Sequence, residues 1–237
     1  MDGILIVDKP QNWTSHDICA FIRKRFQIKK VGHAGTLDPL ATGLLVVLLG
    51  KATKQSSLLS ACDKDYLGVM ELGIKTDSHD RHGKVIAEAD ASSFSLEMVR
   101  EAAKKFTGEI VQVPPMVSAL KYHGVRLYQL ARRGQDVPRE GRKITVYEFA
   151  IEKKEGAFVH FFARVSKGTY LRTLVNDLGE QLGCFATLAA LRRIRSGDFS
   201  LQDSVTVEQL KTFTPEEFKQ KIHQFRILAP HAYSEKR

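Results

Sequence analysis

The sequence predicts an α+β fold in which helices and loops flank one mixed, mostly antiparallel sheet. Strand-like segments come as neighbours in the chain, most clearly 143–153 and 157–166 with a turn at Glu155-Gly156 between them. Helix-like segments occur singly between such pairs and do not follow every strand, which disfavours a parallel βαβ arrangement. No internal repeat or shift in composition divides the 237 residues, so we expect one domain spanning 1–237.

The N-terminal elements follow from apolar runs and capping signals. Residues 3–7 form an apolar run that predicts a short buried strand. Thr14, with Asp17 three residues later, predicts the start of a helix, whose apolar positions recur at helical spacing: Ile18, Phe21, Ile22 and Phe26. The expected elements that follow are a glycine-rich loop over 32–43, a strand over 44–49, a helix from 51 to about 61 and a strand over 64–73.

The later elements are marked by residues that start or stop helices. Ser95 predicts the start of a helix that Gly108 closes. From Pro114 to Lys143 we expect an extended and then basic stretch. Next comes an amphipathic helix that Gly183 ends, with the apolar stripe Leu171, Leu174, Val175, Leu178 and Leu182. A last short helix starts at Thr214-Pro215, because proline is favoured at the first helical position.

The net charge of +9 is concentrated in clusters. These are Arg23-Lys24-Arg25 with Lys29-Lys30, Arg132-Arg133 with Arg139, Arg142 and Lys143, and Arg192-Arg193 with Arg195. Such clusters can neutralise backbone phosphates, although solvated helix faces explain them equally well from charge alone. The longest apolar run, 44–49, is too short to cross a membrane, and the N-terminus lacks a signal-peptide pattern. We therefore expect a cytoplasmic protein and favour a nucleic-acid partner.

The 32–43 loop, with the sequence GHAGTLDPLATG, is the densest local signal for a site. Its glycines allow sharp turns and close approach to a ligand, and Pro39 stiffens the chain after Asp38. A stiff loop is where a positioned catalytic carboxylate is expected. A turn stabilised by an Asx-type hydrogen bond from Asp38 is the competing interpretation.

Two other motifs are weaker. Gly50-Lys51 follows an apolar run, but position 45 is leucine where a phosphate-binding P-loop needs glycine, so we exclude a P-loop. His79 and His82 lie near two acids, but no complementary ligand pair stands elsewhere in the sequence, so we predict a polar hairpin turn over 76–83 and no metal site.

The 166–172 segment, SKGTYLR, lies where a strong strand passes into a helix. Backbone N–H groups are unpaired at such a helix start, which suits a site. Tyr170 and Arg172 both lie off the apolar stripe of that helix. They could face a cleft or be ordinary surface residues of a first helical turn.

These segments together resemble the TruB-type tRNA pseudouridine synthases. The matching pieces, in the order of the family, are GILIVDKP (3–10), GHAGTLDPLATG (32–43), DKDY (63–66), GIKTDSHD (73–80), PPMVSALKYHG (114–124), SKGTYLRT (166–173) and Leu191 to Arg193. They span roughly residues 3 to 200. The resemblance implies the pseudouridine synthase fold and isomerisation of one uridine in the T-loop of tRNA.

The resemblance also implies roles for individual residues. Asp38 matches the catalytic aspartate, and Arg172 an arginine that pairs with it. The substrate-binding residues that it implies are Tyr66, which stacks on the flipped base, Tyr170, the apolar pocket wall Leu191, His33, which fills the place of the flipped nucleotide, Asp80 near that contact, and Lys9 and Lys121, which grip RNA. The segment 114–142 matches a mobile, thumb-like RNA-gripping region. A flipped base needs both an aromatic partner and a filler.

The implied partner is the T-arm stem-loop of tRNA, bound by a monomer that needs no cofactor or metal. Val117 departs from the family, which often has tyrosine there, so one RNA contact is in doubt. With 237 residues the chain has no length for the small PUA domain of many relatives, so we expect the short form. Two alternatives stay open: an RNA-binding or RNA-folding module of the same fold, and a synthase acting on another RNA.

Overall fold

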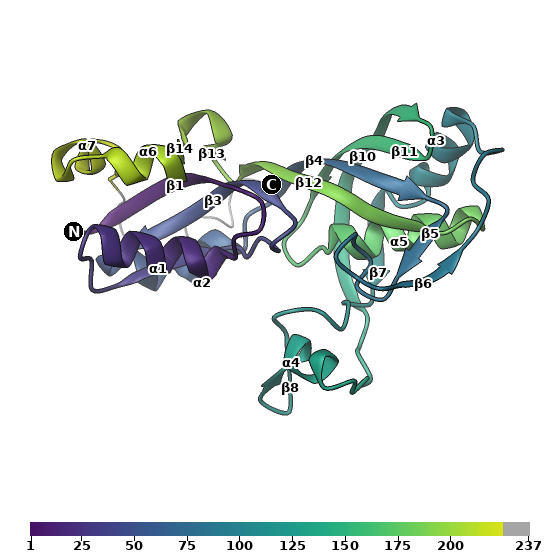
Figure 1. Ribbon diagram of the computed structural model, residues 1–237, viewed down its shortest axis with the longest axis horizontal. Helices are drawn as coiled ribbons and strands as arrows, with labels where there is room; N and C mark the ends of the chain where they lie inside the picture. The colour runs from purple at the N-terminus through teal and green to yellow at the C-terminus, as the bar shows by residue number, and fades with distance from the viewer. Residues whose placement is uncertain (225–237) are drawn as a thin grey trace. The chain divides into compact units, whose positions relative to one another are not determined.

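The computed structural model describes residues 1–224, which form two compact units (Figure 1). Unit 1 comprises Met1–Asp65 and the chain from Arg192 onward, and unit 2 comprises Tyr66–Leu191. Both boundaries fall inside strands, β4 (Lys64–Leu72) and β12 (Ala186–Ser196). No linker separates the units, which explains why composition does not mark a boundary. The expected single catalytic domain stays a prediction.

The strands of unit 1 are arranged around β3 (Thr42–Leu49). β1 (Gly3–Lys9) pairs with β3 antiparallel along its whole length, from Gly3 opposite Leu49 to Lys9 opposite Gly43. β2 (Val31–Ala34) is also antiparallel to β3, whereas the end of β12 pairs with β3 in parallel. The short strands β13 (Phe199–Ser200) and β14 (Val205–Thr206) pair with β12 and β1 respectively. Alternate residues of β1 and β3 form one buried cluster, which includes Ile4, Ile6, Leu44, Val46 and Leu48.

The helices of unit 1 start where the sequence signals place them. α1 (Ser15–Arg25) has the capping box between Thr14 and Asp17, and α7 (Pro215–Gln220) has one between Thr214 and Glu217. The expected helix after 51 divides into the 3-10 helix η1 (Gly50–Gln55) and α2 (Ser56–Ser60). η2 (Leu201–Asp203) and α6 (Val207–Thr212) complete the unit, and Figure 1 shows α6 beside β14.

The expected loop over 32–43 is too long. Its first residues belong to β2, which pairs with β3, and its last two belong to β3, where they pair with β12. The true loop, 35–41, is therefore short and anchored at both ends.

The strands of unit 2 pair in the order β4, β11 (Phe158–Val165), β10 (Arg142–Glu155) and β7 (Gly108–Gln112), and β10 is antiparallel to both β11 and β7. The expected hairpin is confirmed, with Gly156 left-handed at its turn (φ 59°). α5 (Leu171–Leu182) ends at the left-handed Gly183, as expected. α3 (Leu96–Lys104) packs against β10 and α5. Gly108 does not close α3 as expected, because it begins β7.

Two hairpins extend unit 2. β5 (Ile74–Thr76) and β6 (Val85–Glu88) enclose the predicted polar turn over 76–83. The 114–142 segment holds β8 (Lys121–Tyr122), β9 (Val125–Arg126) and α4 (Leu127–Arg132), and Figure 1 shows it projecting away from the strands of this unit. The stretch that we expected to be extended and then basic also contains the short helix α4, which the sequence did not predict and in which Leu127 and Leu130 are buried.

The predicted fold class is confirmed. Most of the strand pairs are antiparallel, and the parallel pairs β1–β14 and β12–β3 make the sheet mixed. Over residues 1–224 no helix is long and apolar enough to span a membrane.

Candidate active site

Asp38 is half-buried on the 35–41 loop of unit 1. Its carbonyl accepts a hydrogen bond from the Ala41 N–H at 3.1 Å, which closes a turn around Pro39. The predicted stiff loop is thus present.

Arg193 of β12 binds both ends of this loop region through its side chain. Its side chain is fully buried, and its Nε donates to the Leu44 carbonyl at 2.7 Å while Nη2 donates to the Gly35 carbonyl at 3.0 Å. Gly43 lies against the backbone of the same residue with φ 96°, and a Cβ there would be 2.3 Å from the Arg193 carbonyl oxygen. Glycine at 43 is therefore required by close approach, because any side chain would separate the two strands.

In the Arg192-Arg193-Arg195 cluster, the side chains of Arg192 and Arg195 are 41% and 37% exposed, so phosphate binding by these two arginines stays a prediction. Arg193 is buried, Arg192 Nη2 contacts Asp8 Oδ2 at 2.6 Å, and Arg195 makes two bonds of 2.7 Å to the buried Asp65. Each of the three guanidinium groups thus has a carboxylate or carbonyl partner from another segment of the chain. Strand register, which composition does not reveal, decides which partner each arginine meets.

Lys9, at the end of β1, is fully buried. Its Nζ donates to the carbonyls of Pro10 at 2.9 Å and Trp13 at 2.6 Å. Burial lowers the pKa of Lys9 to about 8; Arg193 acts in the same direction and Asp38 opposes both. The ammonium group is thus bound within the protein. The predicted contact of Lys9 with RNA would require this group to leave the two carbonyls.

His33 lies half-buried in β2, where its carbonyl accepts a hydrogen bond from Ser56 Oγ at 3.0 Å. Burial, aided by the charges of Arg193 and His16, lowers the pKa of His33, so the imidazole is neutral at pH 7. Its Nδ1 is buried and has no hydrogen-bond partner within residues 1–224. A neutral ring suits the predicted role of replacing a base, and that role stays a prediction.

Two tyrosines of the prediction lie in unit 2. Tyr66 begins that unit's part of β4 and is buried, with 6% of its surface exposed. Tyr170 occupies the N-cap position of α5. Its backbone is held at both ends by Gln112, whose amide donates to the Tyr170 carbonyl at 3.2 Å and accepts from its N–H at 2.8 Å. Gln112 was missed from sequence, because it lies 58 residues away at the end of β7.

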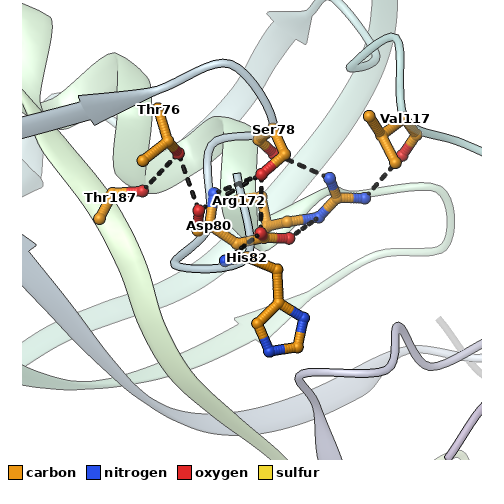
Figure 2. Close-up of polar contacts among 7 residues, drawn as sticks. All are labelled: Thr76, Ser78, Asp80, His82, Val117, Arg172 and Thr187. Atoms are coloured by element: carbon orange, nitrogen blue, oxygen red, sulfur yellow. Dashed lines mark hydrogen bonds and ion pairs between the residues drawn. The ribbon is translucent and has the colours of Figure 1, made fainter. Parts of the chain in front are cut away.

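Asp80 and Arg172 are the centre of a buried polar network (Figure 2). Asp80 Oδ1 accepts from Ser78 Oγ at 2.7 Å and from the His82 N–H at 3.0 Å, and Oδ2 lies 3.6 Å from Arg172 Nε. The His82 ring itself points away from this network in Figure 2. Arg172 donates in addition to the carbonyls of Ser78 at 2.9 Å and Val117 at 2.8 Å.

Val117 and Thr76 join this network through different kinds of atom. Val117 takes part through its carbonyl, so the substitution of the tyrosine common in the family leaves this contact intact. Thr76 Oγ1 donates to the Asp80 carbonyl at 2.8 Å and contacts Thr187 Oγ1 at 2.9 Å, which joins the turn to β12. Ser78 and Thr76 were not singled out from sequence. The predicted pairing of Arg172 with the catalytic carboxylate stays a prediction.

Leu191 is half-buried on β12, and Lys121 is exposed in β8 of the projecting segment. Their predicted roles as pocket wall and RNA contact also stay predictions.

Comparison with known proteins gives the family. The model of the N-terminal domain of TruB family pseudouridylate synthases matches residues 23–171, and that of the tRNA pseudouridylate synthase B C-terminal domain matches residues 172–230. The chain belongs to the TruB family. Family membership confirms the expected pseudouridine synthase fold and an isomerase class of enzyme.

Among TruB relatives, the chain is 46% identical over 218 residues to tRNA pseudouridine synthase B of Clostridium tetani, covering 92% of this chain and 75% of that protein. It is 44% identical to the same-named protein of Opitutus terrae, covering 94% and 92%. A solved Cbf5-Nop10-Gar1 complex contains a chain with a TM-score of 0.71 and 31% identity, covering 93% of this chain and 59% of that one.

Proposed function

We propose that this TruB-family enzyme converts a uridine in the T-loop of tRNA to pseudouridine, with Asp38 as the catalytic carboxylate. The observation that carries the proposal is the anchored, half-buried position of Asp38 in a segment that the family model covers. Relatives named tRNA pseudouridine synthase B support tRNA as the substrate. A structural relative of 29% identity and TM-score 0.65, titled an H/ACA RNP bound to a substrate RNA containing 2'-deoxyuridine, supports uridine-containing RNA as the ligand class.

The reaction breaks the bond between N1 of uracil and C1′ of the ribose and forms a bond between C5 and C1′. The hydrogen on C5 leaves to solvent and N1 gains a proton, so atoms and electrons balance without an oxidant or reductant. An ionised carboxylate can attack the sugar or the base, or remove a sugar proton. Fixing that carboxylate in one place replaces a bimolecular encounter by a positioned one.

The remaining roles concern the flipped base. Removing a base from its stack costs a few kcal/mol, which an aromatic surface for the base and a filler for the vacated place offset. We assign these roles to Tyr66 and His33, with Leu191 as an apolar wall. Tyr170, Arg172 and Asp80 support the pocket, Gln112 fixes the backbone of Tyr170, and Arg172 and Asp80 hold each other.

RNA affinity comes from phosphate contacts, because the chain carries a net charge of +9. The projecting 114–142 segment, with exposed Lys121, is the part we assign to gripping the T-arm. The enzyme of this proposal acts as a cytoplasmic monomer and uses no metal or organic cofactor.

The test uses tRNA labelled with tritium at C5 of uridine. Isomerisation releases the label from the target position to water, so release should approach one tritium per tRNA and disappear when the target T-loop uridine is replaced by cytidine. Release that persists with cytidine at that position would place the activity at another uridine. If tritium is released from a different RNA and not from tRNA, the proposed reaction stands but its substrate is that other RNA.

A further inference from the structure

We propose that Ser15, in the first turn of α1, is a positioning residue that fixes the backbone of Asp38. This inference rests on the proposed function, because it assigns Ser15 a part in the same reaction. Ser15 touches neither the reacting atoms nor RNA in this assignment, and it acts through Leu37, the residue before Asp38.

The contact between Ser15 and Leu37 uses both capacities of one hydroxyl group. Ser15 Oγ accepts from the Leu37 N–H at 2.8 Å and donates to the Leu37 carbonyl at 3.1 Å. Both residues are buried, with 2% and 3% of their surfaces exposed. A single side chain therefore replaces the partner strand that this loop residue lacks.

A second contact holds the other side of Asp38. The Asn12 N–H donates to the Pro39 carbonyl at 2.8 Å. Asn12 has a left-handed backbone, with φ 66°, a conformation that asparagine tolerates better than most residues. The residues before and after Asp38 are thus both bound to the short segment Asn12–Ser15, which we call the bracket.

The bracket is itself fixed. Lys9 Nζ donates to the Trp13 carbonyl at 2.6 Å, from inside the unit. Thr14 and Asp17 exchange two hydrogen bonds, with the Thr14 N–H at 2.8 Å from Asp17 Oδ2 and the Asp17 N–H at 3.0 Å from Thr14 Oγ1. Movement of the Asp38 loop would therefore require the start of α1 to move as well.

Helix capping does not explain the Ser15 hydroxyl. Thr14 is the N-cap residue of α1 and already supplies the capping oxygen, so Ser15 at the first helical position is not needed for that purpose. Both hydrogen bonds of the Ser15 hydroxyl go to Leu37, 22 residues further along the chain. Its contacts point to the loop and not to its own helix.

Removing the hydroxyl should misplace the carboxylate without removing it. Ser15→Ala leaves the buried N–H and carbonyl of Leu37 without this partner, so the loop shifts to find others. A displacement of about 1 Å at a reacting group can lower a rate on the order of a hundredfold. We expect the single-turnover rate to fall roughly 10- to 100-fold and the affinity for RNA to change less than about twofold.

The experiment measures tritium release under single turnover with enzyme in excess over a labelled T-arm stem-loop, together with binding of the same RNA and thermal unfolding. Ser15→Thr keeps the hydroxyl and should recover a large part of the rate. Ser204→Ala is the matched control, because Ser204 is half-buried in the same unit and its Oγ also donates to a backbone carbonyl, that of Leu201 at 2.6 Å. The control should lose stability but keep its rate.

An unchanged rate in Ser15→Ala overturns the proposal, as does a loss of product amplitude with an unchanged rate constant, which indicates only fewer folded molecules. If Ser15→Ala does not fold, Ser15→Cys keeps the volume and weakens both bonds, and the same two results apply to it. Failure of the proposed function looks different, because the parent enzyme itself then releases no tritium.

Discussion

Asp38 in unit 1 and Asp80 in unit 2 are held in opposite ways. Asp38 is fixed through the backbone, by hydrogen bonds to the carbonyl of Pro39 and to both backbone groups of Leu37. Asp80 is fixed through its carboxylate, which accepts from Ser78 and His82 and lies against Arg172.

This difference separates two uses of an acid. The carboxylate of Asp80 accepts hydrogen bonds and lies beside a buried guanidinium, so it keeps these neighbours in place. Around Asp38, by contrast, the neighbouring residues Leu37 and Pro39 are bound through their backbone groups, so a fixed segment of chain carries the carboxylate. The Asp80 contacts hold a turn together and the Asp38 contacts fix a loop, and the assignment of catalysis to Asp38 rests on the proposed function.

The largest expected effect tests whether the carboxylate of Asp38 takes part in the reaction. Asp38→Asn keeps the size of the side chain and all backbone contacts of the loop but removes the charge. We expect pseudouridine formation on a T-arm stem-loop to fall at least about a thousandfold, because removing a residue that performs the chemistry has effects of this order or larger. RNA binding, measured in parallel, should change less than about twofold. Product formation equal to that of the parent would remove Asp38 from the mechanism.

The next effect tests Asp80 as a buried counter-ion. Asp80→Asn removes the carboxylate that lies beside the buried Arg172, and removing one partner of a buried pair in this way costs about 3 kcal/mol of unfolding free energy. Urea unfolding measures it. Glu71→Gln is the control, because its partner Arg81 is 48% exposed and such pairs contribute at most about 1 kcal/mol. Equal losses of unfolding free energy in the two variants would show that the buried Asp80 pair contributes no more to stability than an exposed pair.

A third prediction tests whether Tyr66 of unit 2 contacts the base directly. Tyr66→Ala should lower the single-turnover rate roughly 10- to 100-fold, since stacking on a base contributes about 1 to 3 kcal/mol. Tyr66→Phe keeps the ring and should keep most of the rate. Weaker binding with an unchanged single-turnover rate would contradict the stacking role.

The smallest effect is the part of the pH dependence of stability that comes from His79, next to Asp80 in unit 2. Burial, with Arg172, Lys75 and Arg139 acting in the same direction and Asp80 opposing, lowers the pKa of His79 to about 4. The unfolded chain therefore binds this proton at a higher pH than the folded chain. Stability contributed by the neutral ring is present above the unfolded pKa of about 6.5 and is lost as the pH falls toward 4.

At a pH of about 5 this loss amounts to roughly 1 to 2 kcal/mol. Urea unfolding at pH 5 and 7 measures it, and His79→Asn is the informative variant. Asparagine accepts the left-handed backbone of His79 (φ 62°) but does not titrate. The variant should lose part of the pH dependence, and an unchanged profile would assign that dependence to other groups.

Local signals in the sequence predicted what local physics controls. The capping boxes at Thr14 and Thr214, the stop at Gly183 and the hairpin at Gly156 are confirmed because each depends on residues only a few positions apart. The stiff loop around Asp38 was recognised from its glycines and proline. The resemblance to the TruB family supplied residues such as Tyr66 that local chemistry does not single out.

What the sequence did not reveal depends on register between distant strands. β12 was missed, and its arginines were considered for phosphate binding although Arg193 is buried against carbonyls of β3 and the Asp38 loop. Gln112 and Ser15 escaped notice for the same reason, because their partners lie 58 and 22 residues away. Tertiary contacts of this kind leave no periodic signal.

The burial of Arg193 determines when, during synthesis of the chain, the Asp38 loop acquires its anchor. The ribosome synthesises the Asp38 loop early, but all of unit 2 must follow before Arg193 emerges to hold Gly35 and Leu44. Contacts between such distant parts of a chain form late in folding. A nascent chain that has completed only its first part therefore carries Asp38 without the Arg193 anchor, and the loop gains this anchor only after residue 193 has been synthesised.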